Sequence, residues 1–261
     1  MIKKMMIILI LFASAVSAQN IAADGKPALN KAALYPFSNG EYLHFEVNYG
    51  IMLAGYATIE IHEDKNFNGR DCFIFKTTAK SRRAFDWIFK VRDWTMSYFD
   101  KEKIHTLRFE KQLREGSYEV DIDIDYDQTN HKAKYFRERK GKKNNSAVID
   151  IPENVMDPLS ALFYVRTLDL KVGDEILIPA TDNKKVYDIK VIVHKMQTIE
   201  VPAGKFRCFV VEPIMADGGV FKKDGKVHVW LTADKKKMPV KMETKVYIGS
   251  IAAELDWYVS K

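Results

Sequence analysis

From Gly40 onward, apolar and polar residues alternate in short runs, and this two-residue period limits the choice of fold more than any other feature. Successive side chains of a β-strand point to opposite faces, so the alternation predicts half-buried strands. In the first half of the chain the alternating runs cover residues 42–49, 56–61, 72–79, 91–99, 106–113 and 118–126. Turn-forming residues at 68–69, 115–116 and 127–130 separate these runs, as expected for an antiparallel meander.

A second series of alternating runs fills the other half, at residues 186–200, 206–212, 226–232, 239–247 and 250–258. Between the two series, Asp157-Pro158 predicts the start of a helix, because aspartate accepts from free amides and proline needs no donor there. We therefore expect a mainly β fold with one short packed helix near 157–169. The sheet is predicted to be large, antiparallel and curved, or a barrel-like sandwich, with roughly 11–14 strands.

Two domain arrangements fit this pattern. Residues 37–261 form a single β-rich domain, or two fused β subdomains that share one sheet and meet near 150–170. Residues 19–36 are small, polar and contain a proline, which predicts a flexible lead-in.

The first 18 residues have the layout of a secretory signal peptide. Lys3 and Lys4 precede an apolar run from Met5 to Ala15, and the small residues 16–18 predict cleavage after Ala18. The run is too short to span a bilayer, and no cysteine lies near the cleavage point to carry a lipid. We expect an exported protein, periplasmic or secreted, that is soluble after cleavage and has no transmembrane segment in its mature chain.

The charge balance argues against a nucleic-acid partner. The net charge is only +6, from 41 basic and 35 acidic residues, which is far from a basic footprint. Much of the excess lies in residues 137–145, which predict a solvated hairpin tip or, as the alternative, a contact with a polyanion or lipid headgroup. We expect a monomer.

The two cysteines, Cys72 and Cys208, are too few for a disulfide framework. Both lie in apolar, strand-like runs, which is typical of buried free thiols. One disulfide that closes a long loop is the alternative in an oxidising compartment.

The familiar signatures of catalysis and of metal binding are absent from the sequence. The aspartates of residues 121–127 lack the glycine and the final acid of a calcium loop, and on a strand they would share one water-facing side. The six histidines are dispersed and have no zinc-hydrolase spacing. We therefore expect no catalytic residue, no metal and no cofactor.

An aromatic segment at residues 82–94 is the candidate ligand site. Phe85, Trp87 and Phe89 alternate, so on a strand they would share one face with Val91. Aromatic rings beside cations suit an acyl chain with an anionic head, or a sugar, although a core strand explains the pattern equally well. The candidate ligand-binding residues are Phe85, Trp87, Phe89, Trp94, Arg83 and Lys90.

Several short sequence motifs follow one another along the chain, at residues 37–43, 54–55, 157–166, 201–208, 229–234, 238–241 and 248–251. This set resembles the exported bacterial family catalogued as domain of unknown function 3108, over about residues 37–259. Ala233 departs from the aspartate expected in the family's turn. The resemblance implies an exported, mostly β domain and assigns no reaction, cofactor or catalytic residue.

Two charged residues within these motifs predict an internal ion pair. Glu41 enters an apolar strand and Arg166 lies within an apolar helix, so both would be partly buried and in need of a partner. We expect a structural pair between them.

One main hypothesis follows from the predicted export, the large sheet, the clustered aromatic residues and the lack of a catalytic motif in the sequence. The protein is not an enzyme and binds an apolar or amphiphilic component of the cell envelope in a groove of its sheet. The alternative is a non-catalytic module of envelope biogenesis that contacts a protein or glycan partner, and an unrecognised hydrolase comes third.

Overall fold

The computed structural model describes residues 35–215, 226–246 and 249–260. The predicted signal peptide at 1–18 and nearly all of the predicted lead-in at 19–36 lie outside this range. In the described part of the chain, no helix combines the length and the apolar character needed to cross a bilayer.

Fourteen strands form one sheet in the order β8-β7-β6-β5-β4-β3-β2-β1-β14-β13-β12-β11-β10-β9. Every pair of neighbouring strands is antiparallel. The first half of the chain gives β1 (Tyr42–Tyr49), β2 (Met52–Phe67), β3 (Arg70–Ser81), β4 (Arg92–Asp100), β5 (Thr106–Glu115), β6 (Tyr118–Asp127), β7 (Lys132–Arg139) and β8 (Asn145–Asp150). The second half gives β9 (Glu175–Ala180), β10 (Tyr187–Val201), β11 (Gly204–Met215), β12 (Val227–Thr232), β13 (Pro239–Lys245) and β14 (Ser250–Val259). The predicted curved antiparallel sheet is confirmed, at the upper end of the expected strand count.

Two meanders make up this sheet, and they join where β1 pairs with β14. The β2–β3 turn shows how the sequence directs each hairpin: Asn68 and Gly69 both have positive φ, at 51° and 77°, as a tight two-residue turn requires. In β2, a Cβ on Gly55 would lie 2.4 Å from the main-chain oxygen of Lys80. Only glycine therefore allows β2 and β3 to approach this closely.

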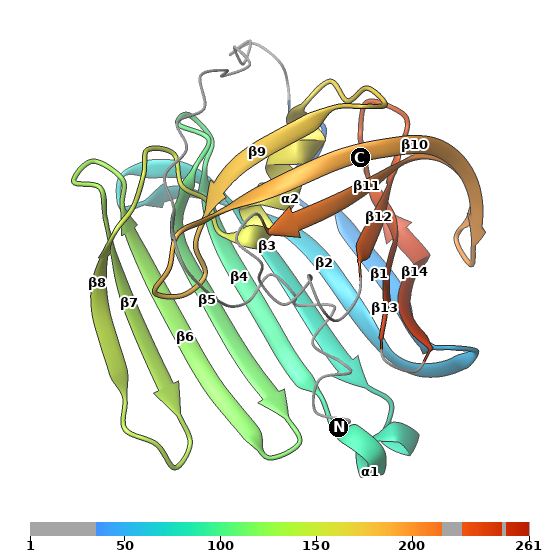
Figure 1. The fold of residues 1–261 in the computed structure, drawn as a ribbon, viewed down its shortest axis with the longest axis horizontal. Helices are drawn as coiled ribbons and strands as arrows, with labels where there is room; N and C mark the ends of the chain where they lie inside the picture. Colours follow the sequence, from blue (N-terminus) through green and yellow to red (C-terminus); the bar gives the residue numbers. More distant parts are fainter. Residues whose placement is uncertain (1–34, 216–225, 247–248, 261) are drawn as a thin grey trace.

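The helix α2 (Pro158–Thr167) links the two edge strands, β8 and β9, and lies in the hollow of the curved sheet (Figure 1). Asp157 caps it as predicted, and its Oδ1 accepts from the amides of Leu159 and Ser160 at 2.8 and 3.1 Å. Its Oδ2 accepts from the hydroxyls of Ser97 and Thr106 at 2.5 and 2.8 Å. The cap therefore also fixes the start of the helix to β4 and β5.

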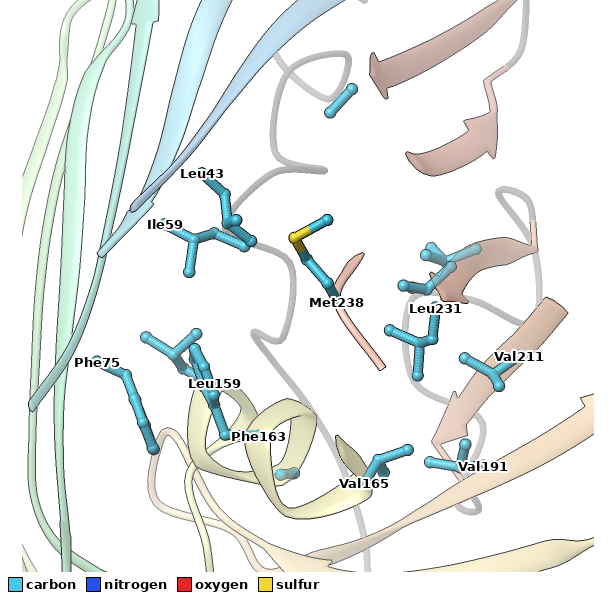
Figure 2. Close-up of a cluster of buried hydrophobic side chains, with 14 of the residues drawn as sticks. Leu43, Ile59, Phe75, Leu159, Phe163, Val165, Val191, Val211, Leu231 and Met238 are labelled. Carbon is cyan, nitrogen blue, oxygen red and sulfur yellow. The ribbon is translucent and has the colours of Figure 1, made fainter. Parts of the chain in front are cut away.

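The apolar core fills the space between α2 and both meanders. Phe163 of α2 stacks on Phe75 of β3, with ring centroids 3.6 Å apart. Val165, on the same helix, belongs to the same cluster as Val191 and Val211 of the second meander (Figure 2). A single buried cluster thus spans the two halves of the chain.

The structure brings Glu41 and Arg166 together as a bidentate ion pair. Nη1 and Nη2 of Arg166 donate to Oε1 and Oε2 of Glu41 at 2.6 and 3.0 Å, and both side chains are fully buried. Arg166 Nε donates to the main-chain oxygen of Lys236 at 3.2 Å, and the guanidinium lies over the rings of Phe37 and Phe163. The pair connects α2 to the start of β1 and to the β12–β13 turn.

We expect Arg166→Met to lower the free energy of unfolding by about 3–5 kcal/mol, because it leaves the Glu41 carboxylate buried without a partner. Urea unfolding measures this loss. The double variant Glu41→Leu with Arg166→Met should recover much of it. As a control, Lys190→Met breaks the partly exposed pair with Glu175 at 2.7 Å and should cost no more than about 1 kcal/mol. A cost for Arg166→Met as small as that of the control would contradict the assigned role.

Candidate functional site

The aromatic segment forms a short helical connection between β3 and β4, not the predicted strand. Residues Arg83–Phe85 make a 3-10 turn that continues into α1 (Asp86–Phe89). Ser81 Oγ and the Arg92 guanidinium donate to Asp86 at 2.5 and 2.7 Å, so the connection is held at both of its ends. The strand prediction is wrong because alternation over so few residues also fits one turn of helix followed by a strand.

This connection separates the candidate ligand-binding residues instead of placing them on one face. Phe89 is buried with Ala79 and Val91, whereas Trp87 is 83% exposed at the tip. Trp94 lies on the opposite face of β4 from the buried Asp93 and Thr95. Phe85 is half-buried, and Arg83 and Lys90 are exposed at the same end of the sheet. None of these six residues lines the cavity inside the sheet.

That cavity lies between α2 and the concave face of the sheet, and its volume is about 90 Å³. Its wall is almost wholly apolar. Leu159, Ala161 and Val165 come from α2, Ile59 and Phe109 from the first meander, and Val191, Val211 and Val229 from the second. Figure 2 shows Ile59 on one side of α2, and Val191 and Val211 on the other. Thr77 and Thr95 add hydroxyl groups on the side formed by β3 and β4.

A buried charge cluster, formed by Asp93, Lys111, Glu115 and Asp182, lies beside the hydroxyl side of this cavity. Thr95 of the cavity wall faces Lys111 across the β4–β5 pair. Lys111 Nζ lies 3.9 Å from Asp182 Oδ2, which is too far for a hydrogen bond, and both side chains are almost fully buried. Among the described residues, Asp182 Oδ2 and Thr95 Oγ1 have no hydrogen-bond partner.

Burial shifts the protonation of every member of the cluster. It raises the pKa of Glu115 to about 7, and the nearby Asp93 charge adds to the increase. It also raises the pKa of Asp93 and of Asp182 to about 6 in each case, although the Lys111 charge acts in the opposite direction. The pKa of Lys111 is lowered by burial, against the attraction of the surrounding acids. The cluster therefore takes up protons close to neutral pH.

The sequence does contain a signal for this cluster, although the overall count of charged residues does not show it. Phe109 faces inward on β5, so the two-residue period places Lys111 and Glu115 on the same inner face. A lysine at an inward position of a strand needs a buried partner. The partner, Asp182, follows β9 and could not be placed from the sequence.

The remaining sequence candidates have structural roles. Cys72 on β3 and Cys208 on β11 are free and buried, so the disulfide considered for them is absent. Five strands separate β3 from β11 in the sheet, and burial raises the pKa of each thiol to about 12.

The alternating aspartates of β6 share one face of the strand, as expected. Arg108 of β5 pairs with Asp125 at 2.5 Å and with Asp123 at 3.4 Å. Arg114, also on β5, pairs with Asp121 at 2.8 Å.

The fold and its interior define a class: a β-rich protein in which one open, barrel-like sheet wraps around a helix and a small apolar cavity. The chain belongs to the family described as "Protein of unknown function (DUF3108)", whose sequence model matches residues 44–256. No curated protein matches the chain.

One solved structure supports the fold. The chain is similar to a beta-barrel-like protein of domain of unknown function DUF1849 from Brucella abortus, with a TM-score of 0.58 and 12% identity over 86% of this chain and 99% of that one. A protein described as exported, with a YmcC-like fold, from Bacteroides fragilis has a TM-score of 0.37 and 10% identity over 86% and 98%. Neither description names a reaction.

We expect Glu115→Gln to stabilise the protein at pH 7.5 and to have little effect at pH 4.5. A carboxyl group whose folded pKa is raised lowers stability as pH rises from its ordinary pKa, near 4.5, to its folded value, about 7. Where the pKa of a group is higher by one in the folded than in the unfolded protein, the full loss of stability is about 1.4 kcal/mol.

Urea unfolding at several pH values measures this difference between the variant and the wild type. The matched control is Glu102→Gln, at a side chain that is 75% exposed, and its difference from the wild type should be small at every pH. If the free energy of unfolding of Glu115→Gln changed with pH in parallel with that of the wild type, Glu115 would not be protonated in the folded protein over this pH range.

Proposed function

We propose that this is an exported envelope protein that binds the apolar end of an amphiphilic ligand in the cavity between α2 and the sheet. The observation that carries the proposal is the composition of the cavity wall, which is apolar on α2 and the second meander and carries hydroxyls on one side. Natural ligand sites combine a mostly apolar wall with a few polar groups in the same way.

The size of the cavity restricts the ligand. Typical sites for small molecules measure roughly 300–1,000 Å³, and an engineered apolar cavity of about 150 Å³ holds benzene. At about 90 Å³, this cavity accommodates a short apolar group, such as the end of an acyl chain, and leaves the rest of the molecule outside. The unpartnered Thr95 Oγ1 supplies one hydrogen-bonding group at the wall.

Filling the cavity should weaken ligand binding. We expect Val229→Phe, whose larger side chain would occupy this space, to reduce copurifying ligand at least about tenfold, since a larger residue in a packed interior displaces whatever shares that space. Native mass spectrometry and solvent extraction of the purified protein measure the bound material.

The matched control is Val148→Phe, at a side chain that is 64% exposed on β8 and does not line the cavity. Thermal unfolding of both variants checks that each remains folded. If the wild type carries no apolar molecule, or if Val229→Phe retains the same amount, the proposal fails.

A second candidate is an interaction surface at the α1 end of the sheet. Trp87 is 83% exposed and Ile51, in the β1–β2 turn, is fully exposed. The two turns share one end of the sheet, because the amide of Arg82 donates to the main-chain oxygen of Ala54 at 2.9 Å (Figure 1). The connection that carries Trp87 also has exposed basic residues, Arg82, Arg83 and Lys90, as suits an anionic envelope surface.

Cosedimentation with phosphatidylglycerol vesicles tests this second candidate. We expect Trp87→Ala to weaken binding about tenfold, because the exposed indole is the largest apolar group of the tip. Trp257→Ala is the control, at a side chain that is 47% exposed on β14 and stacks on Tyr42. Equal binding by both variants, or no preference for anionic over neutral vesicles, would exclude this surface.

A further inference from the structure

Three neighbouring strands of the second meander bring His194, Glu212 and His228 together. The ligand atoms of these residues all lie within 4.8 Å of one another, and no other group of at least three His, Cys, Asp or Glu residues in the described ranges is placed to hold a metal ion. His194 Nε2 lies 2.6 Å from Glu212 Oε2. His228 of β12 completes the group, with its ring centroid 6.0 Å from that of His194.

The register of the strands explains this convergence. Val211 and Val229 face each other and line the interior cavity, so the adjacent residues Glu212 and His228 point together to the outer face. On β10 the pairing shifts between Val193 and Lys195, which leaves His194 as an extra residue. Such a bulge redirects a side chain, here onto the carboxylate of Glu212. Successive members of the group are 18 and 16 positions apart in the chain, so a search for short metal-binding spacings does not detect them.

The donor set matches the preferences of zinc. Imidazole nitrogen and carboxylate oxygen are usual Zn²⁺ ligands, and two histidines with one glutamate leave a fourth position for water or another ligand. Glu212 is only 3% exposed, so its charge needs compensation within the protein. His194 is partly exposed, which provides a route for the ion to reach the group.

We propose that His194, Glu212 and His228 form a Zn²⁺ site with one open coordination position on the outer face of the sheet. The site joins β10, β11 and β12, and it does not depend on the interior cavity. Lys226 competes with the ion, because its Nζ lies 3.6 Å from Glu212 Oε1. In the absence of metal, the Lys226 ammonium group lies beside the carboxylate, and His194 forms a hydrogen bond with it.

A purely structural arrangement would be a hydrogen-bonded His–Glu pair, and the chain contains such a pair elsewhere. His62 Nε2 lies 3.2 Å from Glu60 Oε2, with no third ligand grouped with them among the described residues. His62 therefore provides a matched control for a histidine beside a glutamate. Only the three-residue group should hold zinc in competition with a chelator.

The experiment is a Zn²⁺ titration of the tag-free mature chain against a chromophoric chelator. We expect one equivalent of Zn²⁺ to bind with micromolar or tighter affinity. His228→Ala should weaken binding by at least about 10–100-fold, because the loss of a group that only supports a metal ligand already has an effect of this size. His62→Ala should bind as the wild type does. Lys226→Ala should bind more tightly, because it removes a positive charge beside the carboxylate.

Thermal unfolding gives an independent readout that does not involve the chelator. At a Zn²⁺ concentration 100 times the dissociation constant, the wild-type Tm should rise by about 5 °C, and that of His228→Ala should rise much less. Zinc affinity unchanged by His228→Ala, binding no tighter than that of an exposed histidine, or a Tm indifferent to zinc in the wild type would each overturn the proposal.

Discussion

The position of α2 in the hollow of the sheet is the constraint on which the rest of the structure depends. An open sheet of 14 strands has two edges, and this chain must cross from β8 to β9 to continue. Two buried charged residues fix the crossing: Asp157 holds the start of the helix to β4 and β5, and Arg166 holds its last turn to Glu41. The residue just before the cap, Met156, also pairs with Ala180 of β9. The helix thus replaces the strand pairing that would close a barrel, and the cavity is the space left beside it.

Features that are local in the chain could be predicted from the sequence. The two-residue period gave the β fold, Asp157-Pro158 gave the helix start, and an arginine inside an apolar helix required a buried acid. Strands β7, β8 and β9 were harder to recognise, because each has few buried apolar positions: β7 buries only Ala133 and Tyr135, and β8 buries no residue. The prediction of a strand for the aromatic segment was wrong for a different reason. Phe85 and Trp87 alternate, but Asp86 accepts hydrogen bonds from Ser81 and Arg92 and so stabilises a helical turn.

Contacts between distant strands could not be predicted. The partner of Lys111 lies beyond β9, and the cavity wall is shared by α2 and both meanders. The histidine and glutamate residues on β10, β11 and β12 likewise come together only through the register and a bulge. Spacing along the chain detects a site that lies on one helix or loop, whereas a sheet assembles its sites across strands.

The pairing of β1 with β14 has a consequence for how the chain is completed. In this sheet the first and the last strands are neighbours at the centre, where Tyr42 faces Val259. During synthesis, β1 therefore lacks one of its two neighbours until β14 has been made, so this contact between residues far apart in the chain cannot form earlier. A shortened C-terminus would open a seam in the middle of the sheet instead of trimming its margin.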